Sequence, residues 1–335
     1  MNKFEEITND IDIIIGEDNI RDILRKRKLR IYWGTTPSSF FHIYHIIPLL
    51  QIKKFVDNDC DVKILLADIH AYLDMVSKST EIINFEVLEH RTDIHHKIIK
   101  YFLDFFKINL NNVFFIQGTS YQTREEYTMD VFKFNALCKV SQLKKAGENI
   151  LIQNEDTDPL MTSLLYPTLQ ALDIEYLDTD VFYGDSNQKG ICMLANDVLE
   201  KMGYSKKGYL LSDMYSNLKN MDKISMIDSY EKISEKINRM NLQDLLYLIE
   251  YIIFEICVIK NISLNIAEYY FNNFDDMTEK CKERKILISD IKTGVINFFE
   301  DIINPIRSEF LNEPDLIQKL DDAKYLTKKV EKYKD

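Results

Sequence analysis

A stripe of polar residues marks the first part of this sequence that could do chemistry. Tyr166, Gln170 and Asp173 follow one another at intervals of four and three residues within an apolar run. On a helix this spacing directs all three side chains toward one face. An aspartate there can accept a hydrogen bond from a hydroxyl group. The competing interpretation is an amphipathic helix with a chance polar stripe.

A second group of candidates surrounds the ends of predicted strands. Residues 29–34 and 62–68 have the composition of strands, and the run from about Phe41 to Val56 between them has that of a helix. A strand, a crossover helix and a second strand form a βαβ unit, which implies a parallel sheet. Ligands bind beyond the carboxyl ends of such strands. We therefore expect one crevice lined by Tyr32, Gly34, the 35–39 loop, Asp68, His70 and the loop after Tyr183.

The remaining chain divides into two regions. Residues 9–28 read as a helix, and residues 113–117 and 180–183 read as two more strands. From about Ser229 to Leu320 the apolar pattern is helical, without further convincing strands. We therefore predict an α/β domain over residues 1–225 and an all-helical domain over residues 226–335.

Length and composition exclude several classes of protein. The chain has 335 residues, of which 46% are hydrophobic, so it can form two proper cores and is not a disordered chain. Its net charge of −12 makes it a poor general nucleic-acid binder, so any RNA contact must come from local basic patches. Its longest apolar stretch, 245–259, contains Glu250 and Glu255, and its first residues lack the apolar core of a signal peptide. Five scattered cysteines are typical of free thiols in a reducing cytosol.

Several ordered segments of this chain resemble one family. They are Tyr32-Trp-Gly-Thr35, Ile64-Leu-Leu-Ala-Asp-Ile-His-Ala-Tyr-Leu-Asp74, Gln117-Gly-Thr-Ser-Tyr-Gln122, Glu126-Tyr-Thr-Met-Asp130, Lys144-Lys-Ala-Gly147, Leu164-Leu-Tyr-Pro-Thr-Leu-Gln-Ala-Leu-Asp173 and Asn304-Pro-Ile-Arg307. The chain resembles tyrosyl-tRNA synthetases of the archaeal and eukaryotic type from its first helix to about Lys324. The resemblance implies a Rossmann-like catalytic domain of class I with a connective insertion at about residues 100–160. A helical anticodon-binding domain would follow, usually in a homodimer.

The resemblance assigns a tyrosine pocket. It implies that Tyr32 and Asp173 face the phenol group, while Tyr166, Gln170 and Gln188 hold the ammonium group. A site built to hydrogen-bond a hydroxyl rejects the analogue that lacks it. The tyrosine pocket is complete in this sequence.

The nucleotide site departs from the family. Class I synthetases carry a His-x-Gly-His signature whose imidazoles meet the ATP phosphates at a helix N-terminus. This chain has His42-Ile-Tyr-His45, in which Tyr44 replaces the glycine and is expected to crowd or fill the adenine site. The loop before it, residues 37–41, has lost another glycine and is unusually apolar. Gly34 is retained at this site.

Two further nucleotide segments are altered. The Lys-Met-Ser-Lys-Ser loop of the family is shortened to residues 218–222, which leaves Lys219 or Lys223 as the candidate catalytic lysine. Residues 223–233 align with the strand and capped helix that follow this loop. The glycine-rich segment reads Gly184-Asp-Ser-Asn-Gln188, with Asn187 where the family has aspartate. All these departures fall on ATP, so the sequence predicts weak ATP binding.

On the RNA side, Lys189 matches a basic residue near the acceptor stem, and Asp290 matches the aspartate that reads the first anticodon base. Leu287 stands where the family has a histidine, and an aromatic-Gly-Gly segment that stacks on the base is missing from residues 260–274. Because stacking contributes affinity for single-stranded bases, we expect weakened anticodon reading.

The sequence therefore predicts a cytoplasmic tyrosine–tRNA ligase, or a close descendant, that uses ATP with Mg²⁺ and binds tyrosine and tRNA(Tyr). One alternative is a related enzyme that uses tyrosine or tyrosyl-tRNA outside translation. The other is a non-catalytic paralogue that binds tyrosine or tRNA and has lost ATP chemistry. We expect no resident metal, since His90, His95 and His96 do not have the spacing of a ligand set on a helix. We also expect no membrane association.

Overall fold

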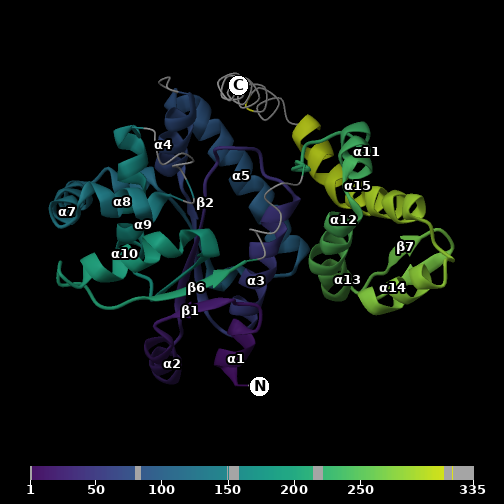
Figure 1. Cartoon of the computed structure of the whole chain (residues 1–335), viewed down its shortest axis with the longest axis horizontal. Coiled ribbons are helices and arrows are strands. Elements are labelled where there is room, and N and C mark those ends of the chain that lie inside the picture. Colours follow the sequence, from purple (N-terminus) through teal and green to yellow (C-terminus); the bar gives the residue numbers. More distant parts are fainter. Residues whose placement is uncertain are drawn as a thin grey trace.

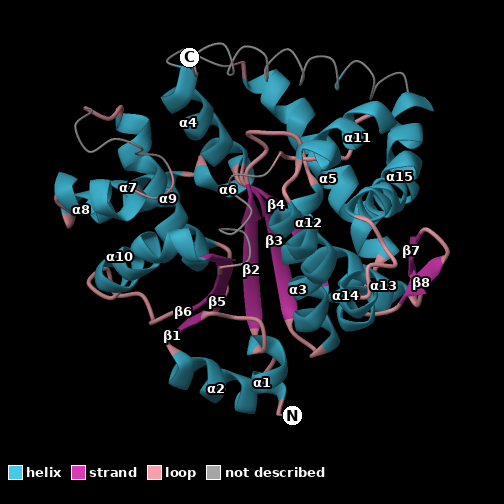
Figure 2. Ribbon diagram, turned by 45° about the vertical axis from the view of Figure 1, so that its right-hand side comes forward, coloured by secondary structure: helices cyan, strands magenta, loops and turns pink. Residues whose placement is uncertain are grey.

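The computed structural model of this chain describes residues 2–79, 84–148, 150, 158–213, 222–312 and 319. A six-stranded sheet with the order β1-β6-β5-β2-β3-β4 forms its centre (Figures 1 and 2). The strands are β1 Ile13–Ile15, β2 Arg30–Thr35, β3 Asp61–Leu66, β4 Val113–Gln117, β5 Val181–Asp185 and β6 Gly208–Ser212. All neighbouring strands are parallel except β1, which pairs with β6 in antiparallel fashion.

Helices cover both faces of this sheet. They are α1 Lys3–Thr8, α2 Glu17–Lys26, α3 Ile46–Asp57, α4 Asp68–Ser79, α5 Phe85–Phe105, α6 Thr119–Gln122, α7 Glu125–Ala136, α8 Val140–Gly147, α9 Met161–Tyr176 and α10 Lys189–Leu199. Side chains alternate along β2, so Ile31 and Trp33 share a core with α3 and α5, while Tyr32 packs with α9 and α10. The predicted α/β class with a Rossmann-like parallel core is confirmed.

A mostly helical region follows the sheet and lies on the side of α3 and α5 (Figure 1). It comprises α11 Tyr230–Arg239, α12 Leu242–Leu248, the π-helical turn η5 Ile249–Ile253, α13 Phe254–Lys260, α14 Phe274–Lys282 and α15 Ile288–Asn312. Its apolar residues are continuous with the core between the sheet and α3. Within the described ranges, no helix is long and apolar enough to cross a membrane.

The predicted absence of strands after Ser229 is wrong. β7 Leu264–Ile266 and β8 Tyr269–Phe271 form a hairpin that packs against α15. Only Ala267 and Glu268 connect the two strands, and Ala267 adopts a left-handed φ of 53°. Strands of three residues carry too few alternations to stand out from a helical pattern.

The predicted helix over residues 9–28 is also wrong in its first half. Residues 13–15 form β1 instead, and they pair with residues 209–211 of β6, a strand that the sequence pattern did not reveal. Gly16 separates β1 from α2 with a φ of 78°, a conformation that glycine adopts without strain. Three consecutive isoleucines fit a helix face and a strand equally well, and only the partner strand decides between them.

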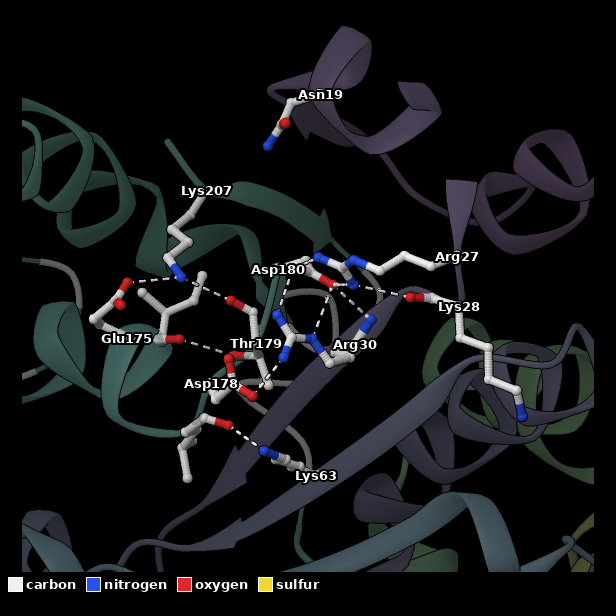
Figure 3. A network of polar contacts seen from close by, with 12 residues as sticks. Asn19, Arg27, Lys28, Arg30, Lys63, Glu175, Asp178, Thr179, Asp180 and Lys207 are labelled. Carbon is white, nitrogen blue, oxygen red and sulfur yellow. Dashed lines mark hydrogen bonds and ion pairs between the residues drawn. The ribbon is translucent and has the colours of Figure 1, made fainter. Parts of the chain in front are cut away.

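A polar network fixes the amino ends of the central strands, opposite the expected crevice (Figure 3). Asp180, just before β5, accepts hydrogen bonds from Arg27 Nη1 at 2.6 Å and Nη2 at 2.7 Å, and it also pairs with Arg30. Burial opposes the charge on Asp180, but the two arginines outweigh it and hold the pKa of the carboxyl at about 2. Beside it, Lys207 donates to the Thr179 carbonyl at 2.9 Å. This network positions strands; it lies away from the cavities described next.

Candidate functional site

A cavity of about 300 Å³ opens at the carboxyl ends of the central strands. All five residues predicted for the tyrosine pocket line it: Tyr32, Tyr166, Gln170, Asp173 and Gln188. They come from β2, α9 and the short turn η3 Ser186–Gln188. The predicted helix that carries three of them is α9.

Asp173 is the most enclosed polar group in this cavity, with 1% of its surface exposed. Its Oδ1 atom accepts hydrogen bonds from the Tyr121 hydroxyl at 2.7 Å, Gln122 Nε2 at 2.8 Å and the Tyr127 hydroxyl at 2.9 Å. The Tyr127 hydroxyl shares its single proton between Oδ1 and the Leu169 carbonyl, also at 2.9 Å. Its Oδ2 atom has no hydrogen-bond partner and lies 3.5 Å from Nε2 of His70. One carboxylate oxygen is therefore saturated, and the other remains available to a ligand.

Burial shifts the pKa values of Asp173, His70 and Tyr32 in this cavity. Burial raises the pKa of Asp173, although nearby His70 and the three donors to Oδ1 oppose the shift. Burial also lowers the pKa of His70, which keeps its imidazole neutral beside the carboxylate. Burial raises the pKa of Tyr32 well above its ordinary value, so Tyr32 is a neutral hydroxyl, which donates to the Gln170 carbonyl at 3.4 Å.

Sequence reasoning assigned no role to Tyr121, Gln122 and Tyr127. Tyr121 and Gln122 lie on α6, directly after the carboxyl end of β4, so the rule that placed the crevice could have found them. Tyr127 lies on α7, and no spacing in the sequence relates it to Asp173.

Two amide oxygens complete the polar wall. Gln170 Oε1 and Gln188 Oε1 are buried without a hydrogen-bond partner. A buried acceptor without a hydrogen bond costs free energy of folding, so these two oxygens fit a ligand that carries a cationic or N–H group. Gly184 is required beside them, because a Cβ there would lie 2.3 Å from Gln188 Oε1 and 2.4 Å from the Phe182 ring.

A second cavity of about 680 Å³ adjoins the first. The two share Gly34, Thr36 and Gln188 in their walls. The second one is lined further by the carboxyl ends of β2, β5 and β6 and by the start of α3, including His45 and Gly184. Two adjoining cavities suit a ligand pair that reacts where the cavities meet.

The histidine pair lies at the start of α3. The predicted helix of 41–56 begins as a 3₁₀ turn, η1 Ile43–His45, before α3. The His42 backbone N–H donates to His45 Nδ1 at 3.1 Å, and the two ring centroids are 3.9 Å apart. Burial lowers the pKa of both imidazoles well below the ordinary value, and nearby Lys223 lowers it further. His45 lines the second cavity, whereas His42 does not.

The Tyr44 side chain, expected to crowd or fill the adenine site, does not line the second cavity. Its ring is buried edge-on against His42, with centroids 5.4 Å apart. Its hydroxyl donates to the Asp222 carbonyl at 3.1 Å, and Tyr44 is absent from the wall of the cavity. The start of η1 turns this side chain into the core instead of toward the strand ends.

The segment after residue 221 pairs with the histidine turn. The Ile43 N–H donates to the Ile224 carbonyl at 2.9 Å, and the Met226 N–H donates to the Phe41 carbonyl at 3.0 Å. Ser229 then caps α11. Of the strand and capped helix expected from residues 223–233, the structure has the capped helix, α11; in place of the strand there is an isolated bridge between His42 and Ser225. Residues 218–221 of the shortened loop lie outside the described residues.

The two residues predicted to contact RNA lie on separate elements. Lys189 is exposed at the first turn of α10. Asp290 begins α15, where its Oδ2 atom accepts a hydrogen bond from the Leu287 N–H at 2.9 Å. Tyr270 in β8 is 72% exposed.

No metal site accompanies these groups in the part of the chain that the structure describes. There, no three His, Cys, Asp or Glu side chains are grouped so that they could hold an ion.

Comparisons with known proteins agree with this geometry. The family model of class I tRNA synthetases (W and Y) matches residues 24–304. The chain belongs to this family. It is 35% identical to "Probable tyrosine–tRNA ligase, cytoplasmic" of Enterocytozoon bieneusi over 330 residues, 94% of this chain and 92% of that protein. It is 30% identical to "Tyrosine–tRNA ligase, cytoplasmic" of Saccharomyces cerevisiae over 339 residues, 92% of this chain and 84% of the yeast protein.

Solved structures show the same fold. The tyrosyl-tRNA synthetase of Archaeoglobus fulgidus, complexed with L-tyrosine, matches with a TM-score of 0.74 and 23% identity. The match covers 92% of this chain and 99% of that one. The tyrosyl-tRNA synthetase of Aeropyrum pernix matches with a TM-score of 0.77 and 20% identity, over 96% and 98% of the two chains.

Proposed function

We propose that this protein is a tyrosine–tRNA ligase that forms tyrosyl-adenylate from tyrosine and ATP and transfers the tyrosyl group to tRNA(Tyr). The observation that carries the proposal is the single open oxygen of Asp173 at the closed end of a cavity whose other end joins a larger one. Such a carboxylate accepts the hydrogen bond of a phenol, which phenylalanine cannot donate.

Tyrosine would bind with its phenol between Asp173 Oδ2 and the Tyr32 hydroxyl. Its ammonium group would contact the oxygens of Gln170 and Gln188 and the hydroxyl of Tyr166. The tyrosine carboxylate then lies at Gly34 and Thr36, where the two cavities meet.

ATP would occupy the second cavity. Gly34 and Gly184 leave its wall free of side chains, and His45 lies at the start of α3, where backbone N–H groups favour phosphate. The tyrosine carboxylate attacks the α-phosphorus, forms the acyl-phosphate bond and releases pyrophosphate. The chain positions the two substrates, and His45, His42 and Lys223 supply electrostatic stabilisation. No covalent bond between the protein and a substrate is needed.

Mg²⁺ enters with ATP in this proposal. Magnesium usually keeps several waters and binds through substrate phosphates with one or two carboxylates. Asp185 is the carboxylate in the wall of the second cavity. The donor set therefore fits an ion carried by ATP and not a resident one.

For tRNA, we propose that Lys189 contacts the acceptor end and that Asp290 contacts the anticodon. Anticodon reading should be weaker than in relatives that keep a stacking segment, because the turn of the β7–β8 hairpin holds no aromatic side chain. Transfer of tyrosine to tRNA(Tyr) transcripts with a changed first anticodon base tests this reading.

We also propose a homodimer in the cytoplasm, where the named relatives are placed. Exposed apolar side chains occur on β4, on α7, directly after α7 and at the start of α8: Phe114, Met129, Phe132, Leu137 and Val140. Exposed apolar patches of this kind mark protein interfaces. Light scattering at micromolar concentration measures the mass that decides between monomer and dimer.

The altered signatures at the nucleotide site keep two alternatives open, a related enzyme acting outside translation and a non-catalytic paralogue. Calorimetry with L-tyrosine, L-phenylalanine and L-tryptophan tests the pocket first. Aminoacylation of tRNA(Tyr) then separates the ligase from both alternatives.

A further inference from the structure

Helix α5 holds the loop that precedes the histidine pair. Arg91 and His95 lie one helical turn apart on α5, and neither exposes any surface. Arg91 Nη1 donates to the carbonyl oxygens of Ser38 at 2.7 Å and Pro37 at 3.5 Å, and His95 Nε2 donates to that of Ser39 at 2.8 Å. Three successive carbonyls of one loop are thus held by two buried side chains.

The two phenylalanines of this loop face the same pair. The Arg91 guanidinium lies over the Phe40 ring, 5.0 Å from its centroid. Phe41 stacks on His45 with centroids 4.4 Å apart and meets His95 edge-on at 5.6 Å. A continuous set of contacts therefore leads from α5 through the loop to the imidazole that lines the second cavity.

The opposite side of the loop is held as well. The backbone of Phe41 and Ile43 pairs with that of residues 224–226. Residues 37–43 are therefore fixed between α5 and a second segment, and no freedom remains for His45 to move without breaking buried hydrogen bonds.

We propose that Arg91 and His95 are positioning residues for adenylate formation: they fix residues 37–41 so that His45 meets the ATP phosphates. This inference rests on the proposed ligase function. Burying a guanidinium is costly, and a buried charge is retained where its hydrogen bonds are met. Here the loop carbonyls accept the hydrogen bonds of Nη1.

The proposal fixes the tautomer of His95. A carbonyl oxygen only accepts, so Nε2 must carry the proton. Burial lowers the pKa of His95 to about 4, so the ring is neutral near pH 7.

The test compares three variants in tyrosine-dependent ATP–pyrophosphate exchange. His95→Phe keeps the aromatic contact with Phe41 and removes the donor, so we expect kcat/KM for ATP to fall on the order of ten-fold. His95→Gln keeps an N–H donor and should recover most of this loss. His96→Phe is the matched control, since His96 packs on Phe115 on another side of α5. Calorimetric Kd values for tyrosine should be equal in all three.

Two outcomes would overturn the proposal: His95→Phe exchanging like the wild type, or tyrosine affinity falling in parallel with exchange, as general damage to the fold would produce. If His95→Phe does not fold, nitrogen NMR of the wild type decides, because a proton on Nδ1 of His95 excludes the hydrogen bond to Ser39. A wild type without any exchange would instead count against the ligase function itself.

Discussion

The Oδ2 atom of Asp173 lies 3.5 Å from Nε2 of His70, and both side chains are buried. The imidazole is neutral, and neither Nε2 of His70 nor Oδ2 of Asp173 has a hydrogen-bond partner, so Oδ2 can accept a hydrogen bond from a ligand. A buried acceptor without a partner costs about 1–3 kcal/mol, which the hydroxyl of a bound phenol would recover. In the proposed function, the discrimination between tyrosine and phenylalanine would rest on this one atom.

Asp173→Asn should weaken tyrosine binding strongly. The amide has no charge, so the hydrogen bond with the phenol loses its charge assistance, worth about 1.5–3 kcal/mol, or roughly a 10- to 150-fold rise in Kd. Calorimetry with tyrosine measures this change in Kd.

Asp130→Asn is the matched control for this substitution. Asp130 also accepts a hydrogen bond from a tyrosine hydroxyl, that of Tyr176 at 3.0 Å, but it lines neither cavity. Its variant should bind tyrosine normally. An unchanged Kd in Asp173→Asn would show that the phenol binds elsewhere.

Tyr127→Phe should weaken tyrosine binding modestly. It removes one of three donors to Oδ1, at a cost of about 1 kcal/mol, or roughly a five-fold rise in Kd. The variant keeps the ring and its packing. A rise as large as that of Asp173→Asn would mean that Tyr127 contacts tyrosine directly.

Tyrosine affinity should fall in acid. Burial raises the pKa of Asp173, so the carboxylate is protonated at a higher pH than an ordinary aspartate, whose pKa is about 3.9. Because the protonated form cannot accept at both oxygens, the Kd should rise as pH falls through this raised pKa. Since the Tyr127 hydroxyl favours the charged form, Tyr127→Phe should move the onset to still higher pH. A Kd that stays constant down to pH 4 would contradict the role of Asp173.

Some helices, strands and site residues could be predicted from the sequence because their pattern is local. Others could not, because they depend on residues far along the chain. The spacing of Tyr166, Gln170 and Asp173 is a property of one helix, and α9 has it. Residues 13–15 form a strand because they pair with β6, some 195 residues later in the chain. No local sequence pattern predicts this pairing. The direction of the Tyr44 side chain depends likewise on its partner, the Asp222 carbonyl. Local periodicity predicts helices and strands whose pattern is clear. Where a segment fits both a helix and a strand, its pairing with distant residues decides which one forms.

Tyr44→Ala should not improve ATP binding. The tyrosine ring fills core space beside His42 and does not line the second cavity, so removing it leaves a hole that costs about 3–5 kcal/mol of stability. Thermal unfolding measures the loss, and calorimetry with ATP should find an unchanged or weaker affinity. Tighter ATP binding in the variant would show that Tyr44 obstructs the nucleotide.

Asp180 should make folding stability depend on pH in acid. Its pKa is held at about 2 in the folded state, against about 3.9 in the unfolded chain, so it contributes about 2 kcal/mol at neutral pH. This contribution is present above about pH 4 and is lost as pH falls toward 2.

Asp180→Asn should remove that acid dependence and cost about 2–4 kcal/mol at pH 7 in urea unfolding. Asp57→Asn is the control, since Asp57 forms an exposed pair with Lys53 and should cost less than about 1 kcal/mol. Equal losses of unfolding free energy in both variants would contradict a role of the network of Figure 3 in positioning β5.

The most direct test of the account is ATP–pyrophosphate exchange with purified protein. We expect exchange that requires tyrosine and is not supported by phenylalanine, because the adjoining cavities hold the tyrosine carboxylate against the α-phosphate of ATP. Absence of exchange, while calorimetry still detects tyrosine binding, would contradict the ligase function and favour a paralogue that has lost ATP chemistry.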